Sequence, residues 1–215
     1  MIRILVVLHI VSGAVALLAM IGAFCTTKGG RWHRQMGKCY TVAMAIALTL
    51  AAVVSLLTAN MFLLLIGFFS GYFVYTGWRL TQVRDGTRNS VDRLTSTLML
   101  CGSIIMVAYG LYLFTRGESL GLALGVFGIF ALIPAWQDYR GSQWPVGKDR
   151  IVLHLNRMGG ASIATVTAAF VVNIQTNPVY IAWLLPTIVG APLIAYWSKR
   201  VMRPSTEIYL SLIHI

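Results

Sequence analysis

The stretch GGRWHRQMGKCY, from Gly29 to Tyr40, is a short basic segment between two long apolar runs. The run before it, Ile4–Thr27, has 24 residues and no charged side chain, and the run after it, Cys39–Trp78, has 40. A helix needs about 20 apolar residues to cross a hydrocarbon core of about 30 Å. The first run is therefore long enough for one spanning helix, and the second is long enough for two.

The rest of the chain repeats this pattern. Three further charge-free runs cover residues 94–115, 119–137 and 158–198. The two longest runs contain turn-forming residues near their middles, at Thr58–Asn60 and at NIQTNP (Asn173–Pro178). Backbone polar groups in lipid need partners within the segment, so these spans should be helical. We predict an all-α, polytopic membrane protein with one domain over residues 1–209 and seven helices, at about 4–26, 39–58, 61–78, 94–115, 119–137, 154–173 and 179–198.

The composition agrees with lipid as the solvent. Of the 215 residues, 58% are hydrophobic and 11% are charged, and the mean hydropathy is +0.77. A soluble domain carries about 25% charged residues. The net charge of +11 would suggest a nucleic-acid partner in a soluble protein, but the position of the charges favours another explanation.

Seven helices place alternate connections on opposite sides of the membrane. One side would hold Thr26–Lys38, Arg79–Arg93, Asp138–Arg157 and the segment after Ser198, which contain four, four, four and three of the 17 Lys and Arg residues. Cytoplasmic loops of membrane proteins are enriched in Lys and Arg. The pattern predicts an outside N-terminus and a cytoplasmic C-terminus, with the lipid bilayer as a partner and no nucleic acid.

His9 is the histidine expected inside the first helix. At helical spacing it shares a stripe of small residues with Gly13, Ala16, Met20 and Ala23, which would let a neighbouring helix approach. We expect its imidazole to bond a carbonyl or hydroxyl of that helix. The alternative is a ligand to haem or metal, or a hydrogen-bond donor to a substrate. A bis-histidine haem needs a second histidine at matching depth, and none lies in that half.

His33 and His154 lie near the predicted starts of the second and sixth helices. Helical periodicity gives the sixth helix a small, polar face that we expect to pack inward, made of His154, Arg157, Ala161, Thr165 and Ala168. A second shared face lies near the start of the second helix and contains His33, Gly37, Tyr40 and Met44. Arg34 and Tyr40 accompany His33, and Arg157 accompanies His154. Helix N-termini and arginines favour anions. These residues form a candidate site for a phospholipid head group, a phosphate or carboxylate metabolite, or a haem propionate. The alternative is that the arginines only set the orientation and contact lipid phosphates.

Two other kinds of site receive less support. Zinc would need Cys25, Cys39 and the two histidines as ligands, but their spacing matches no standard zinc module. We therefore predict no cofactor, with haem and zinc as the less favoured alternatives. Four acids, Asp85, Asp92, Asp138 and Asp149, are expected in solvated loops, where a metal-dependent hydrolase would also use the histidines. No common enzyme motif is present, so we lean away from an enzyme.

Glycine pairs predict close helix contacts. Gly67–Gly71 and Gly121–Gly125 are spaced four residues apart, with Gly128 near the second pair. Such spacing places both glycines on one face, where the backbones of two helices can approach.

Four stretches resemble recurrent blocks in a family of bacterial predicted multi-pass membrane proteins of unknown function. They are LHIVSG (Leu8–Gly13), KGGRWHRQMGKCY (Lys28–Tyr40), HLNRMGGASIATVTAAFVVN (His154–Asn173) and WLLPT (Trp183–Thr187). The resemblance covers about a third of the chain. It implies an inner-membrane protein and brings no known substrate or catalytic residue.

Two functional hypotheses follow. The first is a protein that binds or transports a small anionic or lipid-like molecule through a cytoplasm-facing site. The second is a membrane-bound redox or metal-dependent enzyme that uses His9, His33 or His154. The final residues, LSLIHI (Leu210–Ile215), resemble a translated sequencing adapter, so we give them no functional weight.

Overall fold

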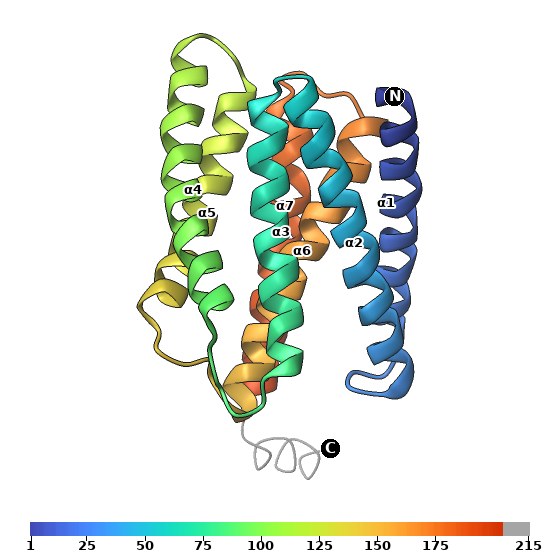
Figure 1. Cartoon of the computed structure of the whole chain (residues 1–215), viewed down its shortest axis with the longest axis vertical. Coiled ribbons are helices and arrows are strands. Elements are labelled where there is room, and N and C mark those ends of the chain that lie inside the picture. The colour runs from blue at the N-terminus through green and yellow to red at the C-terminus, as the bar shows by residue number, and fades with distance from the viewer. Residues whose placement is uncertain (204–215) are drawn as a thin grey trace, which may run out of the picture.

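The structure is a computed structural model that describes residues 1–203, and the regular structure in that part of the chain is helical. Each helix is long and apolar enough to cross a membrane. This confirms the predicted all-α fold and its helix count, and it is consistent with a multi-pass membrane protein. Residues 210–215, interpreted above as an adapter, lie outside the described residues. The helices are α1 (Ile2–Cys25), α2 (Arg31–Leu57), α3 (Met61–Gln82), α4 (Ser90–Thr115), α5 (Leu120–Arg140), α6 (Gly147–Asn173) and α7 (Tyr180–Met202) (Figure 1).

The connections between helices alternate between the two ends of the bundle. Residues 26–30, 83–89 and 141–146 and the last turn of α7 lie at one end, drawn at the bottom of Figure 1. We call this the basic end, because the helix ends and connections there contain 15 of the 17 Lys and Arg residues. The other two, Arg3 and Arg116, belong to the opposite end. The Lys and Arg residues that recur between alternate helices in the sequence are therefore gathered at one end of the folded bundle.

Several helices begin or end beyond the predicted bounds at the basic end. α2 begins at Arg31 rather than at residue 39, and α6 begins at Gly147 rather than at residue 154. The prediction ended each span at its first charged residue, whereas a helix can continue past the apolar core wherever its charged side chains find partners. Helix α4 also starts early, and Asn89 and Asp92 stabilise its start by a reciprocal cap. The Asn89 side chain accepts from the Asp92 N–H at 2.8 Å, and the Asp92 carboxylate accepts from the Asn89 N–H at 3.0 Å.

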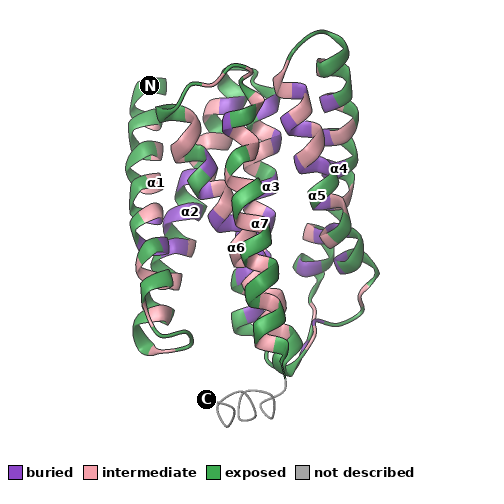
Figure 2. Cartoon of the chain, turned by 180° about the vertical axis from the view of Figure 1, so that it is seen from behind, coloured by how far each residue is buried: buried purple, intermediate pink, exposed green. Residues whose placement is uncertain are grey.

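Helix α3 occupies the middle of the bundle. It packs against α2, α4 and α6, while the α1–α2 hairpin and the α4–α5 hairpin lie on either side and α7 lies behind against α6 (Figure 1). Buried residues gather on the inward sides of the helices, and α1 and α7 are mostly exposed along their length (Figure 2). Aromatic rings fill the centre, where Phe69 of α3 contacts Phe73 and Phe127 with ring centroids 4.9 and 5.5 Å apart. The core of the bundle is therefore packed with apolar and aromatic side chains, and large apolar side chains are also exposed on its outer surface.

The α4–α5 hairpin is held by glycines. A Cβ added to Gly110 of α4 would lie 2.6 Å from the Gly125 nitrogen and 2.7 Å from the Gly121 oxygen, both in the backbone of α5. The predicted role of Gly121 and Gly128 in close packing is confirmed, because a Cβ at either would overlap α4. Gly67 is different, since a Cβ there would meet nothing within 4 Å. The prediction also missed Gly110, which has no glycine at the expected spacing within its own helix.

Replacing Gly110 with alanine should destabilise the protein by about 1–3 kcal/mol, because the added methyl would push apart two backbones that have no side chain to yield. Chemical unfolding of the purified protein in detergent would measure the change in the free energy of unfolding. Gly125→Ala, on the facing helix, is the matched control, since its Cβ would enter open space. Equal destabilisation by both substitutions would contradict the proposed contact.

Candidate functional site

The three histidines of the described chain each bond a backbone carbonyl of a neighbouring helix. The His9 Nδ1 lies 2.9 Å from the Ala47 oxygen in α2, and the His154 Nδ1 lies 2.8 Å from the Gly77 oxygen in α3. The His33 Nδ1 lies 3.0 Å from the Ala23 oxygen in α1. A carbonyl only accepts, so Nδ1 carries the proton in each ring. The structural role expected for His9 is therefore present, and the other two histidines share it.

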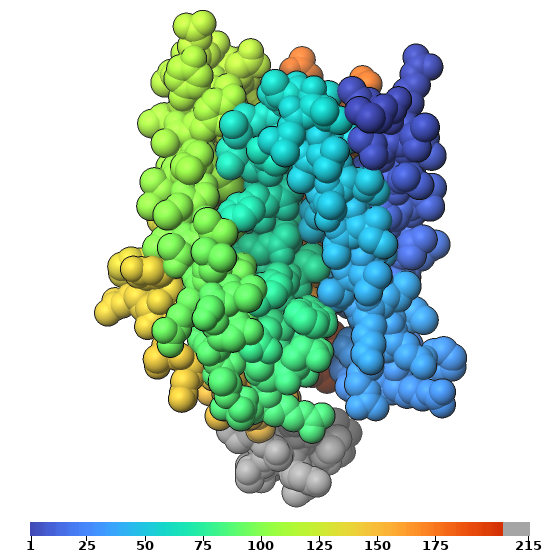
Figure 3. Space-filling view, in the orientation of Figure 1, coloured from blue at the N-terminus to red at the C-terminus, as the bar shows by residue number. Residues whose placement is uncertain are grey.

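Tyr40 joins α2 to the predicted inward face of α6. Its hydroxyl is buried and lies 2.9 Å from the Thr165 hydroxyl. Ala161 and Arg157 of the same face are buried too, whereas Ala168 is exposed. Near the basic end, the surface is hollowed between α2 and α3 (Figure 3). The two faces named from the sequence thus meet at their inner parts.

The predicted anion site consists of His33, Arg34, His154 and Arg157. In the described structure these side chains contact different partners and share none. Arg34 is exposed, and its side chain has no hydrogen bond within residues 1–203. His33 and His154 each bond a backbone carbonyl, that of Ala23 in α1 and that of Gly77 in α3. Arg157 forms an ion pair with Asp138 of α5. A ligand shared by these residues stays a prediction, and the structure draws attention to a second polar centre.

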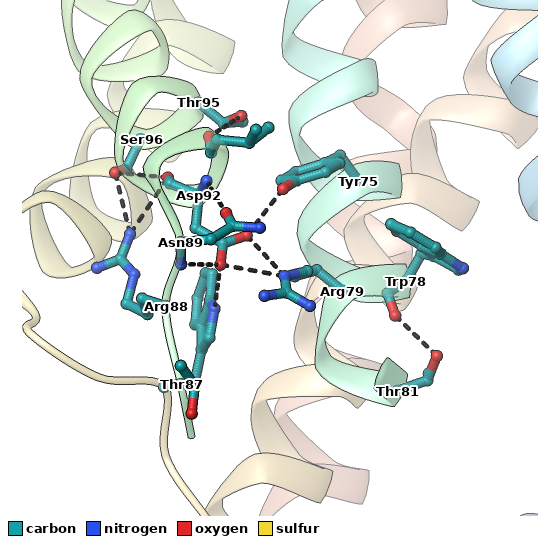
Figure 4. Close-up of polar contacts among 12 residues, drawn as sticks. Tyr75, Trp78, Arg79, Thr81, Thr87, Arg88, Asn89, Asp92, Thr95 and Ser96 are labelled. Atoms are coloured by element: carbon teal, nitrogen blue, oxygen red, sulfur yellow. Dashed lines mark hydrogen bonds and ion pairs between the residues drawn. The ribbon is translucent and has the colours of Figure 1, made fainter. Parts of the chain in front are cut away.

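Asp92 is the first member of that centre, and its carboxylate is buried (Figure 4). Its Oδ1 accepts from the Arg79 Nε at 2.9 Å and from the Tyr75 hydroxyl at 2.8 Å, both in α3. Its Oδ2 accepts from the Trp144 indole N–H at 3.3 Å, in addition to the cap of α4. One carboxylate therefore ties α3, α4 and the α5–α6 connection together.

Asp138 is the second member, near the end of α5. Its Oδ1 accepts from the Arg157 Nη2 of α6 at 2.8 Å, and its Oδ2 accepts from the Tyr72 hydroxyl of α3. The side chains of the ion pair are 4% and 5% exposed. The Arg157 guanidinium also lies 5.4 Å from the centre of the Tyr72 ring. The prediction that Asp92 and Asp138 are solvated loop acids is wrong, because both lie on helices and both are enclosed by donors from other segments.

Arg88 connects the two carboxylate centres. Its Nη1 donates to the Asp138 and Gly141 carbonyls, and its Nη2 donates to the Asp92 carbonyl at 3.3 Å and the Ser96 hydroxyl at 3.1 Å. The guanidinium stacks 4.6 Å from the centre of the Trp144 ring. Its Nε is buried and has no hydrogen-bond partner among residues 1–203. Three guanidinium groups, those of Arg79, Arg88 and Arg157, thus surround two carboxylates, which leaves one positive charge in excess.

A cavity of ≈ 340 Å³ opens beside this cluster at the basic end. We call it the Arg88 cavity. Its size is at the lower end of the range for small-molecule sites. Its wall combines charged, amide and apolar side chains. The lining residues are Arg88, Gln137, Asp138, Gly141, Gln143, Trp144, Pro145, Asp149, Val152, Leu153, Asn156 and Met202.

The wall of the Arg88 cavity carries unused hydrogen-bond donors. The Asn156 Oδ1 accepts from the Ser198 hydroxyl of α7 at 2.6 Å, which leaves the Asn156 NH2 without a partner within residues 1–203. The side chains of Gln137 and Gln143 also make no hydrogen bond to another described residue and are exposed. A guanidinium with amide donors around it is chemically suited to an anion.

Sequence reasoning missed this cavity because its polar residues come from four separate segments. One signal was available. The chain has six acidic residues. Asp138 directly follows an apolar span and Asp92 lies two residues before one, close to positions where an unpaired carboxylate would be costly. Within the described residues, no group of three or more His, Cys, Asp or Glu side chains is placed to hold a metal ion. No protein-family model, curated protein or solved structure matches the chain.

Asp138→Asn should lower the free energy of unfolding by about 3–5 kcal/mol, because it leaves the buried Arg157 guanidinium without its counter-charge. Unfolding in detergent would measure the loss. Adding Arg157→Met should recover part of it, since the double variant buries no unpaired charge. Asp85→Asn is the control, because that carboxylate is exposed. A loss as large for Asp85→Asn, or no recovery in the double variant, would refute the ion pair as the cause.

Proposed function

We propose that the protein is a multi-pass protein of the bacterial inner membrane that binds a small anionic molecule or lipid head group in the Arg88 cavity, with the basic end toward the cytoplasm. The observation that carries this proposal is the excess guanidinium of Arg88 in the wall of a cavity. Its hydrogen bonds go to carbonyl and hydroxyl oxygens, so its positive charge has no counter-ion within residues 1–203.

The electrostatics of the cluster favour an anion as the occupant. A charge held away from water loses solvation, and neutral acceptors offset only part of that loss. An anion in the cavity would supply the missing negative charge, and the amides of Asn156, Gln137 and Gln143 would donate to its remaining oxygens. Hydrogen bonds between a charged group and a neutral donor are among the stronger ones in proteins.

The position of the cavity supports the same assignment. It lies where α5, α6 and α7 reach the basic end. Under the proposed membrane orientation, lipid head groups would lie at this level. The concentration of Lys and Arg at this end supports a cytoplasmic orientation. The resemblance to bacterial multi-pass proteins agrees with the proposed membrane.

One observation favours the second candidate function, a redox or metal-dependent enzyme using His9, His33 or His154. Each ring donates its Nδ1 proton to a carbonyl, and the Nε2 lone pair has no partner within the described chain. Histidines that bind metals are commonly oriented in this way. A visible absorption spectrum and a metal analysis of the purified protein would test it. A haem band or stoichiometric metal that is lost in His→Ala variants would favour the enzyme over the binding protein.

Asn156→Leu should weaken phosphate binding by about tenfold or more, because it removes an amide donor from the cavity wall. Phosphate should raise the melting temperature of the wild-type protein in detergent, at constant ionic strength, because ligand binding at a phosphate concentration c adds RT ln(1 + c/Kd) to the free energy of unfolding. The shift at several phosphate concentrations gives the affinity of each variant.

Ser198→Ala provides the matched control for this measurement. It breaks the same 2.6 Å hydrogen bond to Asn156 but leaves the amide donor in place, so phosphate affinity should stay close to wild type. Arg84→Gln controls for the loss of a positive charge, because Arg84 is exposed and does not line the cavity. Phosphate that fails to stabilise the wild-type protein more than chloride, or that binds Asn156→Leu equally well, would overturn the proposal.

A further inference from the structure

The Arg88 cavity also carries a carboxylate with no partner. Asp149 lines the wall from the first turn of α6, and its side chain makes no ion pair or hydrogen bond with another residue in the described range 1–203. Asp138, the other acid of the wall, is already bonded to Arg157 and Tyr72. The wall of the cavity therefore has one positive charge without an ion-pair partner in residues 1–203, on Arg88, and one such negative charge, on the solvent-exposed carboxylate of Asp149.

This pair of charges discriminates between classes of anion. A plain anion would be attracted by Arg88 and repelled by Asp149. A molecule that bears an anionic group and an ammonium group would satisfy both, with the amides available for its oxygens. Complementary charge of this kind fixes the orientation of a ligand and selects against the wrong partner.

The apolar part of the wall suits the same class of molecule. Val152 and Leu153 of α6 and Met202 of α7 line the cavity beside the charged residues. They would pack against the carbon atoms that separate the two charged groups, or against the first carbons of an attached chain. The cavity volume of ≈ 340 Å³ limits the bound part to the size of a head group.

We propose that the Arg88 cavity is selective for a phosphate–ammonium zwitterion. The charge of Arg88 attracts its phosphate, the amides of the wall donate to the phosphate oxygens, and Asp149 pairs with its ammonium group. This inference rests on the proposed function, since it specifies the ligand of that same cavity. The zwitterion is either the head group of an ethanolamine phospholipid or free phosphoethanolamine, because both carry the same two charged groups.

Asp149 also has a simpler role, which the experiment must separate from selectivity. A carboxylate in the first turn of a helix interacts favourably with the helix dipole. That interaction changes the stability of the protein without ligand, but it does not distinguish two phosphates that differ only in an ammonium group.

The test compares phosphoethanolamine with ethyl phosphate, which lacks the ammonium group. Affinities are measured from melting temperatures of the full-length protein in an uncharged maltoside detergent at constant ionic strength. The wild-type protein should prefer phosphoethanolamine by about fivefold, as expected for a partly solvated charge pair. Asp149→Asn should abolish this preference and leave the affinity for ethyl phosphate equal or higher.

Asp85→Asn is the matched control. It removes the same charge from another connection at the basic end without touching the cavity, so the fivefold preference should remain. A wild-type protein that binds both phosphates equally, or an Asp149→Asn variant that keeps the preference, would overturn the zwitterion proposal while anion binding stands. If neither phosphate binds, the proposed function fails and this inference fails with it.

A second arm identifies the source of the zwitterion. Dihexanoyl phosphatidylethanolamine carries the same head group on short acyl chains. If the natural ligand is a lipid, dihexanoyl phosphatidylethanolamine should bind more tightly than phosphoethanolamine. It should also bind more tightly than dihexanoyl phosphatidylglycerol, which lacks the ammonium group. If the natural ligand is the free molecule, phosphoethanolamine should bind at least as tightly as dihexanoyl phosphatidylethanolamine. Tighter binding of the phosphatidylglycerol than of the phosphatidylethanolamine would overturn the proposal.

Discussion

Two buried carboxylates determine how the basic half of the bundle is put together. An ionised carboxylate among apolar helices is stable only when donors from its surroundings replace the lost water. Asp92 obtains them from Arg79, Tyr75 and Trp144, and Asp138 obtains them from Arg157 and Tyr72. Because these donors come from α3, α6 and the α5–α6 connection, the requirements of two side chains fix the positions of several segments.

The opposite half of the bundle is held by a different kind of contact. There the α4–α5 hairpin closes on Gly110 and Gly121, where the backbones touch, and His9 of α1 bonds the backbone of α2. These contacts involve no net charge, as expected for helices that meet within a lipid-like environment. The bundle therefore changes from close backbone packing at one end to a network of ion pairs at the other.

The distribution of charge along the sequence was enough to predict the number of helices and their alternation, because a charge-free run of about 20 residues has few structural alternatives in lipid. It was not enough to predict where helices begin at the basic end. Arg31 and Asp92 both lie on helices there, at positions that a charge-free criterion places outside. The inward position of Thr165 and Arg157 followed from helical periodicity, and Tyr40 does contact Thr165. The Arg88 cavity depends on which loops meet, and spacing within one helix carries no information on that.

The α1–α2 hairpin contributes no residue to the network of Asp92, Asp138 and their arginines. Its polar links to α6 in the described chain meet at Thr165, whose hydroxyl lies 2.9 Å from the Tyr40 hydroxyl and 3.5 Å from the Met44 sulfur. Its packing against the central core is otherwise apolar. Apolar contacts have little directional preference, whereas an ion pair with shared hydrogen bonds is lost when its helices slide by a few ångströms. Ion pairs thus fix how α3, α4, α5 and α6 are aligned along their axes. No ion pair in the described chain fixes the alignment of the α1–α2 hairpin against them. We therefore expect helices to slide past one another most easily where the α1–α2 hairpin packs against α3 and α6, with the contact of Tyr40 with Thr165 as the main polar restraint.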